Sequence, residues 1–124
     1  MILNKCMNNV SVIMPSLNVV EYIQPCINSV LSQTLHDIEI ICVDAGSTDG
    51  TLEILREYEK KDNRIKVIVS DIKSYGYQMN IGIQAASGKY IGIVETDDFI
   101  DENMFYRLYT LAEKYDVDFV KSGY

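Results

Sequence analysis

The sequence predicts an α/β domain with a mostly parallel β-sheet and flanking helices. Two observations carry this prediction: short, nearly continuous apolar runs rich in β-branched residues, and segments of helical periodicity between them. Such runs are typical of strands that are covered on both faces, as in parallel sheets. Regular alternation of strands and helices favours parallel strands joined by right-handed crossovers. The expected order is βαβαβαβα, with a candidate short fifth strand at the end.

Each predicted strand is an apolar run that stops at a polar residue or at proline. The first run stops at Pro15, because proline lacks the N–H that a strand interior donates. All runs are far shorter than the roughly 20 apolar residues of a membrane-spanning helix. The predicted strands are Val10–Met14, Ile38–Asp44, Ile65–Val69 and Tyr90–Val94, with Phe119–Val120 as the candidate fifth.

Between the strands, apolar residues recur at spacings of three and four, which places them on one face of a helix. Pro25 fits the first turn of the first helix. Thr48 or Asp49 is the expected cap of the second helix and Asp101 of the fourth. Gly82 predicts that the third helix approaches the sheet closely. The stripes are Ile23, Ile27, Val30 and Leu31; Leu52, Leu55 and Tyr58; Met79, Gly82, Ile83 and Ala86; and Met104, Phe105, Leu108, Leu111, Ala112 and Tyr115.

The length of 124 residues predicts one domain, which we expect to begin after a short extension at residues 1–9. Eleven basic and 18 acidic residues give a net charge of −7. This balance argues against nucleic acid and anionic membranes as partners, because both attract clustered positive charge. Three cysteines fit no metal or CxxC spacing, so reduced thiols and an intracellular environment are expected.

Polar residues follow three predicted strands, at the edge where open parallel sheets bind ligands. Taken alone, the turn from Pro15 to Asn18 and the loop from Asp44 to Thr51 fit ordinary strand-to-helix connections. The segment from Glu95 to Asp98 is more informative, because it holds three carboxylates in four residues. Their oxygens suit Mg²⁺ or Mn²⁺. The alternative is a solvated acidic turn before a helix.

Taken in order, four segments resemble motifs of the family 2 glycosyltransferases, which have the Rossmann-like GT-A fold. The resemblance extends from residue 10 to residue 124 and rests on several motifs in the same register. The segments are VSVIMPSLN at 10–18, SVLSQT at 29–34, DIEIICVDAGSTDGT at 37–51 and NIGIQAASGKYIGIVETDDFID at 80–101.

The resemblance implies inverting transfer of a sugar from a nucleotide-sugar donor, most often a UDP-sugar, to a hydroxyl of a saccharide or lipid-linked acceptor. It implies a divalent cation, Mn²⁺ or Mg²⁺, held by Asp97 and Asp98, with Lys73 as a further positive charge near the diphosphate. It also implies a cytoplasmic enzyme of polysaccharide biosynthesis, with membrane association of a longer parent protein left open. The implied nucleotide-sugar-binding residues are Pro15, Ser16, Asn18, Asp44, Gly46, Ser47, Asn80, Glu95, Thr96 and Asp97.

The chain departs from the family pattern at three positions. Ala45 stands where many relatives carry a second carboxylate, Glu95 replaces an aspartate of the metal motif, and Met79 stands where many relatives have arginine. The chain is also shorter than a complete domain of this family. We therefore expect the catalytic base beyond residue 124, and donor binding with little or no transfer by this part alone.

Two other functions are alternatives to a transferase. The first is a non-catalytic nucleotide-binding module, or one that self-associates as a homo-oligomer through exposed apolar surface. The second is a receiver-like signalling domain, which has a similar size, acidity and fold class. A receiver needs a carboxylate pair after its first strand, where this chain has Pro15 and Ser16.

Overall fold

The computed structural model describes residues 9–96 and 101–115, and the strands among them form one parallel sheet in the order β3-β2-β1-β4. This confirms the predicted alternation of strands and helices, whereas the candidate strand Phe119–Val120 lies outside the described residues. No helix in the described part has the length and apolar character of a membrane span. The elements are β1 (Val10–Ser16), α1 (Ile23–Leu31), β2 (Ile38–Asp44), α2 (Thr51–Lys61), β3 (Ile65–Val69), α3 (Tyr75–Ala85), β4 (Tyr90–Ile93) and α4 (Met104–Tyr115).

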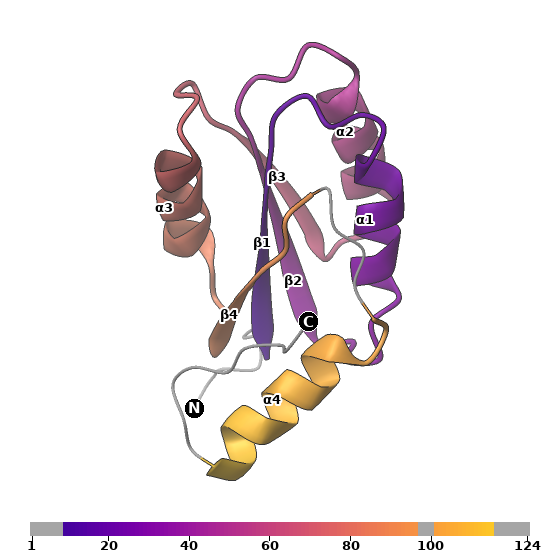
Figure 1. The fold of residues 1–124 in the computed structure, drawn as a ribbon, viewed down its shortest axis with the longest axis vertical. Coiled ribbons are helices and arrows are strands. Elements are labelled where there is room, and N and C mark those ends of the chain that lie inside the picture. Colours follow the sequence, from indigo (N-terminus) through magenta and orange to yellow (C-terminus); the bar gives the residue numbers. More distant parts are fainter. Residues whose placement is uncertain (1–8, 97–100, 116–124) are drawn as a thin grey trace.

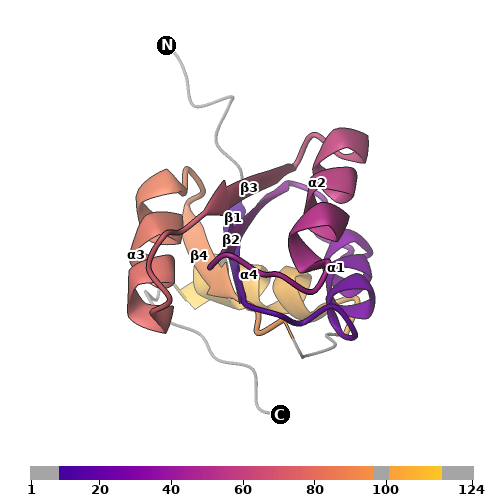
Figure 2. The ribbon, with the colours of Figure 1, turned by 90° about the horizontal axis from the view of Figure 1, so that it is seen from above.

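The sheet lies between α3 on one face and α1 and α2 on the other (Figure 2). Every residue of β1 and β2 is buried, as expected for central strands that helices cover on both faces. Val12 and Met14 belong to the apolar cluster that includes Ile27 of α1. On the α3 face, a Cβ added to Gly82 would lie 2.6 Å from Cγ2 of Ile13, which confirms the predicted close approach of this helix.

The sequence predicted that β1 stops at Pro15, but the strand continues to Ser16. The carbonyl groups of Ile13 and Pro15 both face β4, because they accept hydrogen bonds from Val94 N–H (3.1 Å) and from Thr96 Oγ1 (3.1 Å). The ladder between β1 and β4 ends where Ile13 pairs with Ile93. An N–H at position 15 would face the same side, beyond the end of β4, and would have no strand partner. The proline therefore removes no hydrogen bond from the ladder, and the strand tolerates it.

Two details of the helices also differ from the prediction. The N-cap of α2 is Gly50, with a left-handed φ of 106°, rather than Thr48 or Asp49. Asp49 still contributes to the helix start, because its Oδ1 accepts hydrogen bonds from the N–H (3.1 Å) and the hydroxyl (2.6 Å) of Thr51. In α3 the buried face is formed by Gln78, Met79 and Gly82, and the predicted Ile83 is 46% exposed at its flank.

Candidate functional site

The loops after β1 and β2 and the segment after β4 lie at the same end of the sheet, opposite α4 (Figure 1). β1 is flanked by β2 and β4, so the chain runs outward through β2 and β3 and then crosses back to β4. A reversal of this kind is the switch point at which open α/β sheets bind ligands, beyond the carboxyl ends of the strands. The candidate site is therefore this edge of the sheet.

The Asp44 carboxylate organises the loop after β2. Its Oδ1 accepts hydrogen bonds from the hydroxyls of Ser16 (2.7 Å) and Ser47 (2.6 Å). Its Oδ2 accepts from the N–H groups of Gly46 (3.1 Å) and Ser47 (2.8 Å), and Gly46 takes a left-handed φ of 85°. The structure thus brings Ser16, Asp44, Gly46 and Ser47 into one cluster. Because four donors already fill the two Asp44 oxygens, this side chain shapes the loop, and its contact with a nucleotide stays a prediction.

A second set of hydrogen bonds ties the loop after β1 to the loop after β2. Asn18, at a φ of 53°, accepts from Thr48 N–H at Oδ1 (2.8 Å) and donates its own N–H to Ser47 Oγ (2.8 Å). Val19 N–H donates to Thr51 Oγ1 (3.0 Å). Asn18 is exposed, so it lies on the surface of the candidate site while it braces both loops.

The segment after β4 is fastened to the end of β1. Thr96 is buried, and its hydroxyl donates to the Pro15 carbonyl at 3.1 Å. The Cys26 thiol of α1 donates to the Glu95 carbonyl at 3.4 Å. Pro15, Glu95 and Thr96 therefore share this edge, as the sequence predicted.

The Glu95 carboxylate is exposed, and its Oε1 accepts a hydrogen bond of 2.6 Å from the hydroxyl of Tyr75, the first residue of α3. This hydrogen bond, with partial burial and the charge of Glu95, raises the pKa of Tyr75 to about 12. The Tyr75 hydroxyl is therefore protonated at neutral pH and acts as the donor.

Gln78 also lies at this edge, although none of the sequence motifs includes it. Its side chain is buried, and Nε2 donates to the carbonyl groups of Ser16 (3.0 Å) and Val43 (2.8 Å). It thus joins α3 to the last residues of β1 and β2. The signal in the sequence was its spacing of four from Gly82, which places both residues on the same helix face.

Gln33 anchors the chain on the far side of residues 97–100. Its side chain is fully buried, and Nε2 donates to the carbonyl groups of Asp101 (2.6 Å) and Ser29 (3.2 Å). Its Oε1 accepts from Phe105 N–H at 2.9 Å. The SVLSQT segment therefore fixes the position of Asp101 and of the start of α4.

Two predicted residues within the described ranges are not joined to this cluster. Asn80 is exposed further along α3 and makes no hydrogen bond with the strand ends in residues 9–96 and 101–115. Lys73, just before α3, is exposed and forms no ion pair within those ranges. The predicted metal ligands Asp97 and Asp98 lie outside the described residues. In the part that is described, no three His, Cys, Asp or Glu side chains gather as ligands of one metal ion.

Comparisons with known proteins agree with this architecture. The family model described as Glycosyl transferase family 2 matches residues 11–124. EpsJ of Bacillus subtilis (strain 168), an uncharacterized glycosyltransferase, is 45% identical over 115 residues, which are 93% of this chain and 33% of EpsJ. Glycosyltransferase GlyG of Streptococcus pneumoniae serotype 4 is 40% identical over 116 residues, 93% of this chain and 38% of GlyG. The chain thus spans about a third of the length of these relatives.

Among solved structures, S. aureus TarS 1-349 in complex with UDP-GlcNAc is similar, with 29% identity and a TM-score of 0.80. The similarity covers 87% of this chain and 32% of the TarS chain. The parallel sheet with helices on both faces is therefore a GT-A fold, and a receiver-like domain no longer accounts for the chain. From the agreement of sequence and fold we conclude that the chain belongs to glycosyl transferase family 2.

Proposed function

We propose that this chain is the nucleotide-sugar-binding part of a glycosyltransferase that moves a sugar from a UDP-sugar to an acceptor hydroxyl. One observation carries the proposal: the ends of β1, β2 and β4 converge at a switch point, in a fold similar to that of TarS solved with UDP-GlcNAc. Donor binding is proposed for this chain. Sugar transfer is proposed for a protein of its relatives' length.

The donor lies along the edge where the two braced loops meet the segment after β4. Asn18 and Glu95 supply exposed polar groups there, and Gly46 and Ser47 form a loop held by Asp44. α1 and α2 follow β1 and β2 directly, so the positive ends of their helix dipoles point toward this edge. Such helix ends favour the negative charge of a diphosphate.

A divalent cation, Mn²⁺ or Mg²⁺, is part of the proposal. Glu95 presents an exposed carboxylate at this edge, and its negative charge favours a cation held beside it, so the described residues fit a divalent ion. Asp97 and Asp98 are the proposed ligands. When bound, the ion stabilises the negative charge that develops on the nucleoside diphosphate leaving group. Lys73, before the first turn of α3, adds positive charge at the same end of the sheet.

Transfer with inversion requires a base that takes the proton of the acceptor hydroxyl. We assign no residue of this chain to that role and expect the base beyond residue 124. The acceptor is a saccharide or a lipid-linked saccharide, and the setting is polysaccharide biosynthesis in the cytoplasm, where nucleotide-sugars are made.

Calorimetric titration of UDP, with and without Mn²⁺, tests the donor site. We expect metal-dependent binding that is lost in the double variant Asp97→Ala, Asp98→Ala. The control variant Asp37→Ala changes an exposed carboxylate just before β2, at the opposite end of the sheet, and should bind like the wild type. Absence of UDP binding under every condition would contradict the proposal for this chain.

A sugar-transfer assay separates the transferase from a non-catalytic nucleotide-binding module. We expect little or no transfer by the 124 residues and measurable transfer by a protein that includes the length of the relatives. Robust transfer by the 124 residues would contradict a base beyond residue 124. Nucleotide binding without transfer in the longer protein would favour the non-catalytic module.

A further inference from the structure

The first turn of α3 reaches across the switch point to the one acidic side chain of residues 95–98 that the structure describes. We propose that Tyr75 is a positioning residue for Glu95, which directs one oxygen of that carboxylate toward the hydroxyl groups of the nucleotide's ribose. The inference rests on the proposed function, because it assigns a role within that donor site.

The contact joins two elements that are 20 residues apart in the sequence, with 2.6 Å between Tyr75 Oη and Glu95 Oε1. Within residues 9–96 and 101–115, Tyr75 is the only hydrogen-bond partner of this carboxylate. An exposed glutamate without a partner samples several rotamers, and ordering it costs free energy when a ligand binds. The hydrogen bond restricts that freedom before any ligand arrives, and it leaves Oε2 open as an acceptor.

Tyr75 can act as a fixed reference point because α3 itself is anchored to the strand ends. Gln78, three residues later, donates to the carbonyl groups of both Ser16 and Val43. The hydroxyl of Ser74 caps the helix by accepting from Tyr77 N–H at 3.4 Å. Movement of the first turn of α3 relative to β1 and β2 would therefore break buried hydrogen bonds.

Hydrogen bonds also hold the backbone at Glu95, so only the direction of its side chain is left to be determined. The Glu95 carbonyl accepts from Cys26, and the next residue, Thr96, donates to the Pro15 carbonyl. With backbone and helix both anchored, the Tyr75 hydroxyl decides the direction of the carboxylate.

This arrangement favours one use of Glu95 over another. An oxygen that accepts from a phenol has less capacity for a cation, and a cation that draws on both oxygens would have to displace Tyr75. A ribose hydroxyl needs only the open Oε2. The pair therefore argues against ligation of the metal ion through both oxygens of Glu95, and we assign the open Oε2 to hydroxyl recognition.

The test is a mutant cycle on UDP affinity, measured by calorimetry at saturating Mn²⁺ with Tyr75→Phe, Glu95→Ala and the double variant. We expect Tyr75→Phe to weaken UDP binding about fivefold in the wild type and to have no further effect beside Glu95→Ala. The matched control is Tyr77→Phe, on the same turn and 40% exposed, which should bind UDP like the wild type. Equal losses from Tyr75→Phe in both backgrounds, or no loss in the wild type, would overturn the proposal.

A measurement without ligand separates this inference from the proposed function. The NMR resonance of the Tyr75 Cζ reports the hydrogen bond of its hydroxyl, so we expect Glu95→Ala to shift it and to leave the Tyr77 resonance unchanged. If the resonance shifts and UDP does not bind, the pair exists and the proposed function fails. If UDP binds and the resonance does not shift, the proposed function stands and the role of Tyr75 is wrong.

Discussion

Asp44 gives the loop after β2 its shape through a fully buried carboxylate with four donors. Asn at this position would keep the size but turn one acceptor into an NH₂ group that faces other donors. We expect Asp44→Asn to lower the free energy of unfolding by about 2–3 kcal/mol, because hydrogen bonds to a charged group are lost. Urea unfolding measures the change.

The matched control is Asp37→Asn, at an exposed carboxylate just before the same strand. It should change the free energy of unfolding by less than about 0.5 kcal/mol, as surface substitutions usually do. Equal destabilisation by the two variants would show that the four hydrogen bonds of Asp44 have no special weight.

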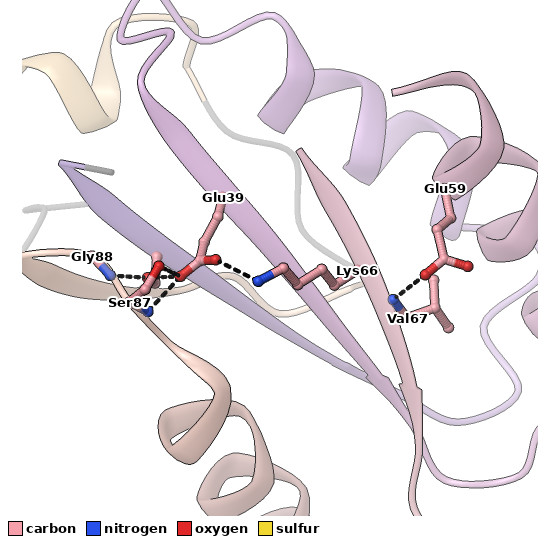
Figure 3. A network of polar contacts seen from close by, with 7 residues as sticks. Glu39, Glu59, Lys66, Val67, Ser87 and Gly88 are labelled. Atoms are coloured by element: carbon pink, nitrogen blue, oxygen red, sulfur yellow. Dashed lines mark hydrogen bonds and ion pairs between the residues drawn. The ribbon is translucent and has the colours of Figure 1, made fainter. Parts of the chain in front are cut away.

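Glu39 is a second buried carboxylate, at the other end of β2. Figure 3 shows it between the Ser87–Gly88 turn and Lys66. It accepts hydrogen bonds from Ser11 Oγ (2.5 Å), from the N–H (2.5 Å) and hydroxyl (2.9 Å) of Ser87, and from Lys66 Nζ (3.2 Å). Burial raises the pKa of Glu39, but these hydrogen bonds together outweigh it and hold the pKa below the ordinary 4.5.

The depressed pKa predicts how stability depends on pH. A carboxyl whose folded-state pKa lies below its unfolded value stabilises the fold at neutral pH and loses that contribution as pH falls through the folded pKa. We therefore expect the gap in free energy of unfolding between wild type and Glu39→Gln to be largest near neutral pH. It should shrink below pH 4.5, the ordinary value for the carboxyl.

Urea unfolding across the acidic range measures this gap. The control is Glu57→Gln, because the Glu57 side chain is 60% exposed. Its partner is Lys60 Nζ, which lies 3.9 Å away in a weak surface ion pair. Its gap should stay near zero at every pH. A Glu39→Gln gap that is constant from neutral to acidic pH would rule out titration of Glu39 as its source.

At the scale of elements, α3 depends on how closely it approaches the sheet. An Ala at position 82 would place its Cβ 2.6 Å from Cγ2 of the fully buried Ile13, so either the helix or the strand must shift. We expect Gly82→Ala to destabilise the fold by about 1–3 kcal/mol in denaturant unfolding, as overpacking does.

Gly76 in the same helix provides the comparison, because a Cβ there would meet nothing within 4 Å. Gly76→Ala should be neutral or stabilising by up to about 1 kcal/mol, since alanine favours helix more than glycine does. Stabilisation by both substitutions would mean that α3 adjusts to the sheet without cost.

Some elements could be predicted from the sequence to the residue, and other features could not. β2 and β3 matched to the residue, because each is an apolar run with polar neighbours. The predicted end of β1 was wrong, because the strand tolerates Pro15 only where β4 has already ended. That position depends on the tertiary structure and not on the local sequence. Gln78 and Gln33 were missed, because an amide in a helix, or in the turn that follows one, is usually on the surface. Both are buried here, and both donate to carbonyl groups that lie far away in the sequence.

In the candidate site, the sequence predicted which strand ends meet but not how their residues are used. Ser16 and Asp44 come together because the parallel strands β1 and β2 end at a common edge. The contact of Tyr75 with Glu95 has no local signal, because it depends on where α3 begins relative to β4. Topology therefore brings predicted residues together, whereas side-chain roles depend on distances that no spacing in the sequence encodes.

At the scale of the whole molecule, the two ends of the sheet are built differently. The amino ends of β1 and β2 hold the Glu39 network and join the turn before β4. The carboxyl ends hold the loops of the candidate site. We therefore expect substitutions at the amino ends, such as those of Glu39, to change the free energy of unfolding alone. Substitutions at the carboxyl ends should also change UDP affinity.

The edge of the sheet at β4 predicts self-association. Ile91 and Ile93 of β4 are 45% and 51% exposed. They pair in register with Ser11 and Ile13 of β1. On this face α3 covers Ile13 and the turn after α3 covers Ser11, whereas Ile91 and Ile93 stay exposed. β4 is the last strand of the described sheet on that side. Exposed edge strands with apolar side chains pair readily with other chains.

We expect the 124 residues to form dimers whose population rises with concentration in analytical ultracentrifugation. The double variant Ile91→Lys, Ile93→Lys should shift them to monomer, because like charges on the paired edges repel. Tyr106→Lys, at a residue of α4 that is 52% exposed, is the control and should leave the association unchanged. Association that survives in the double variant would place the contact on another surface. A monomer at every wild-type concentration would mean that this edge, though apolar, binds no second copy.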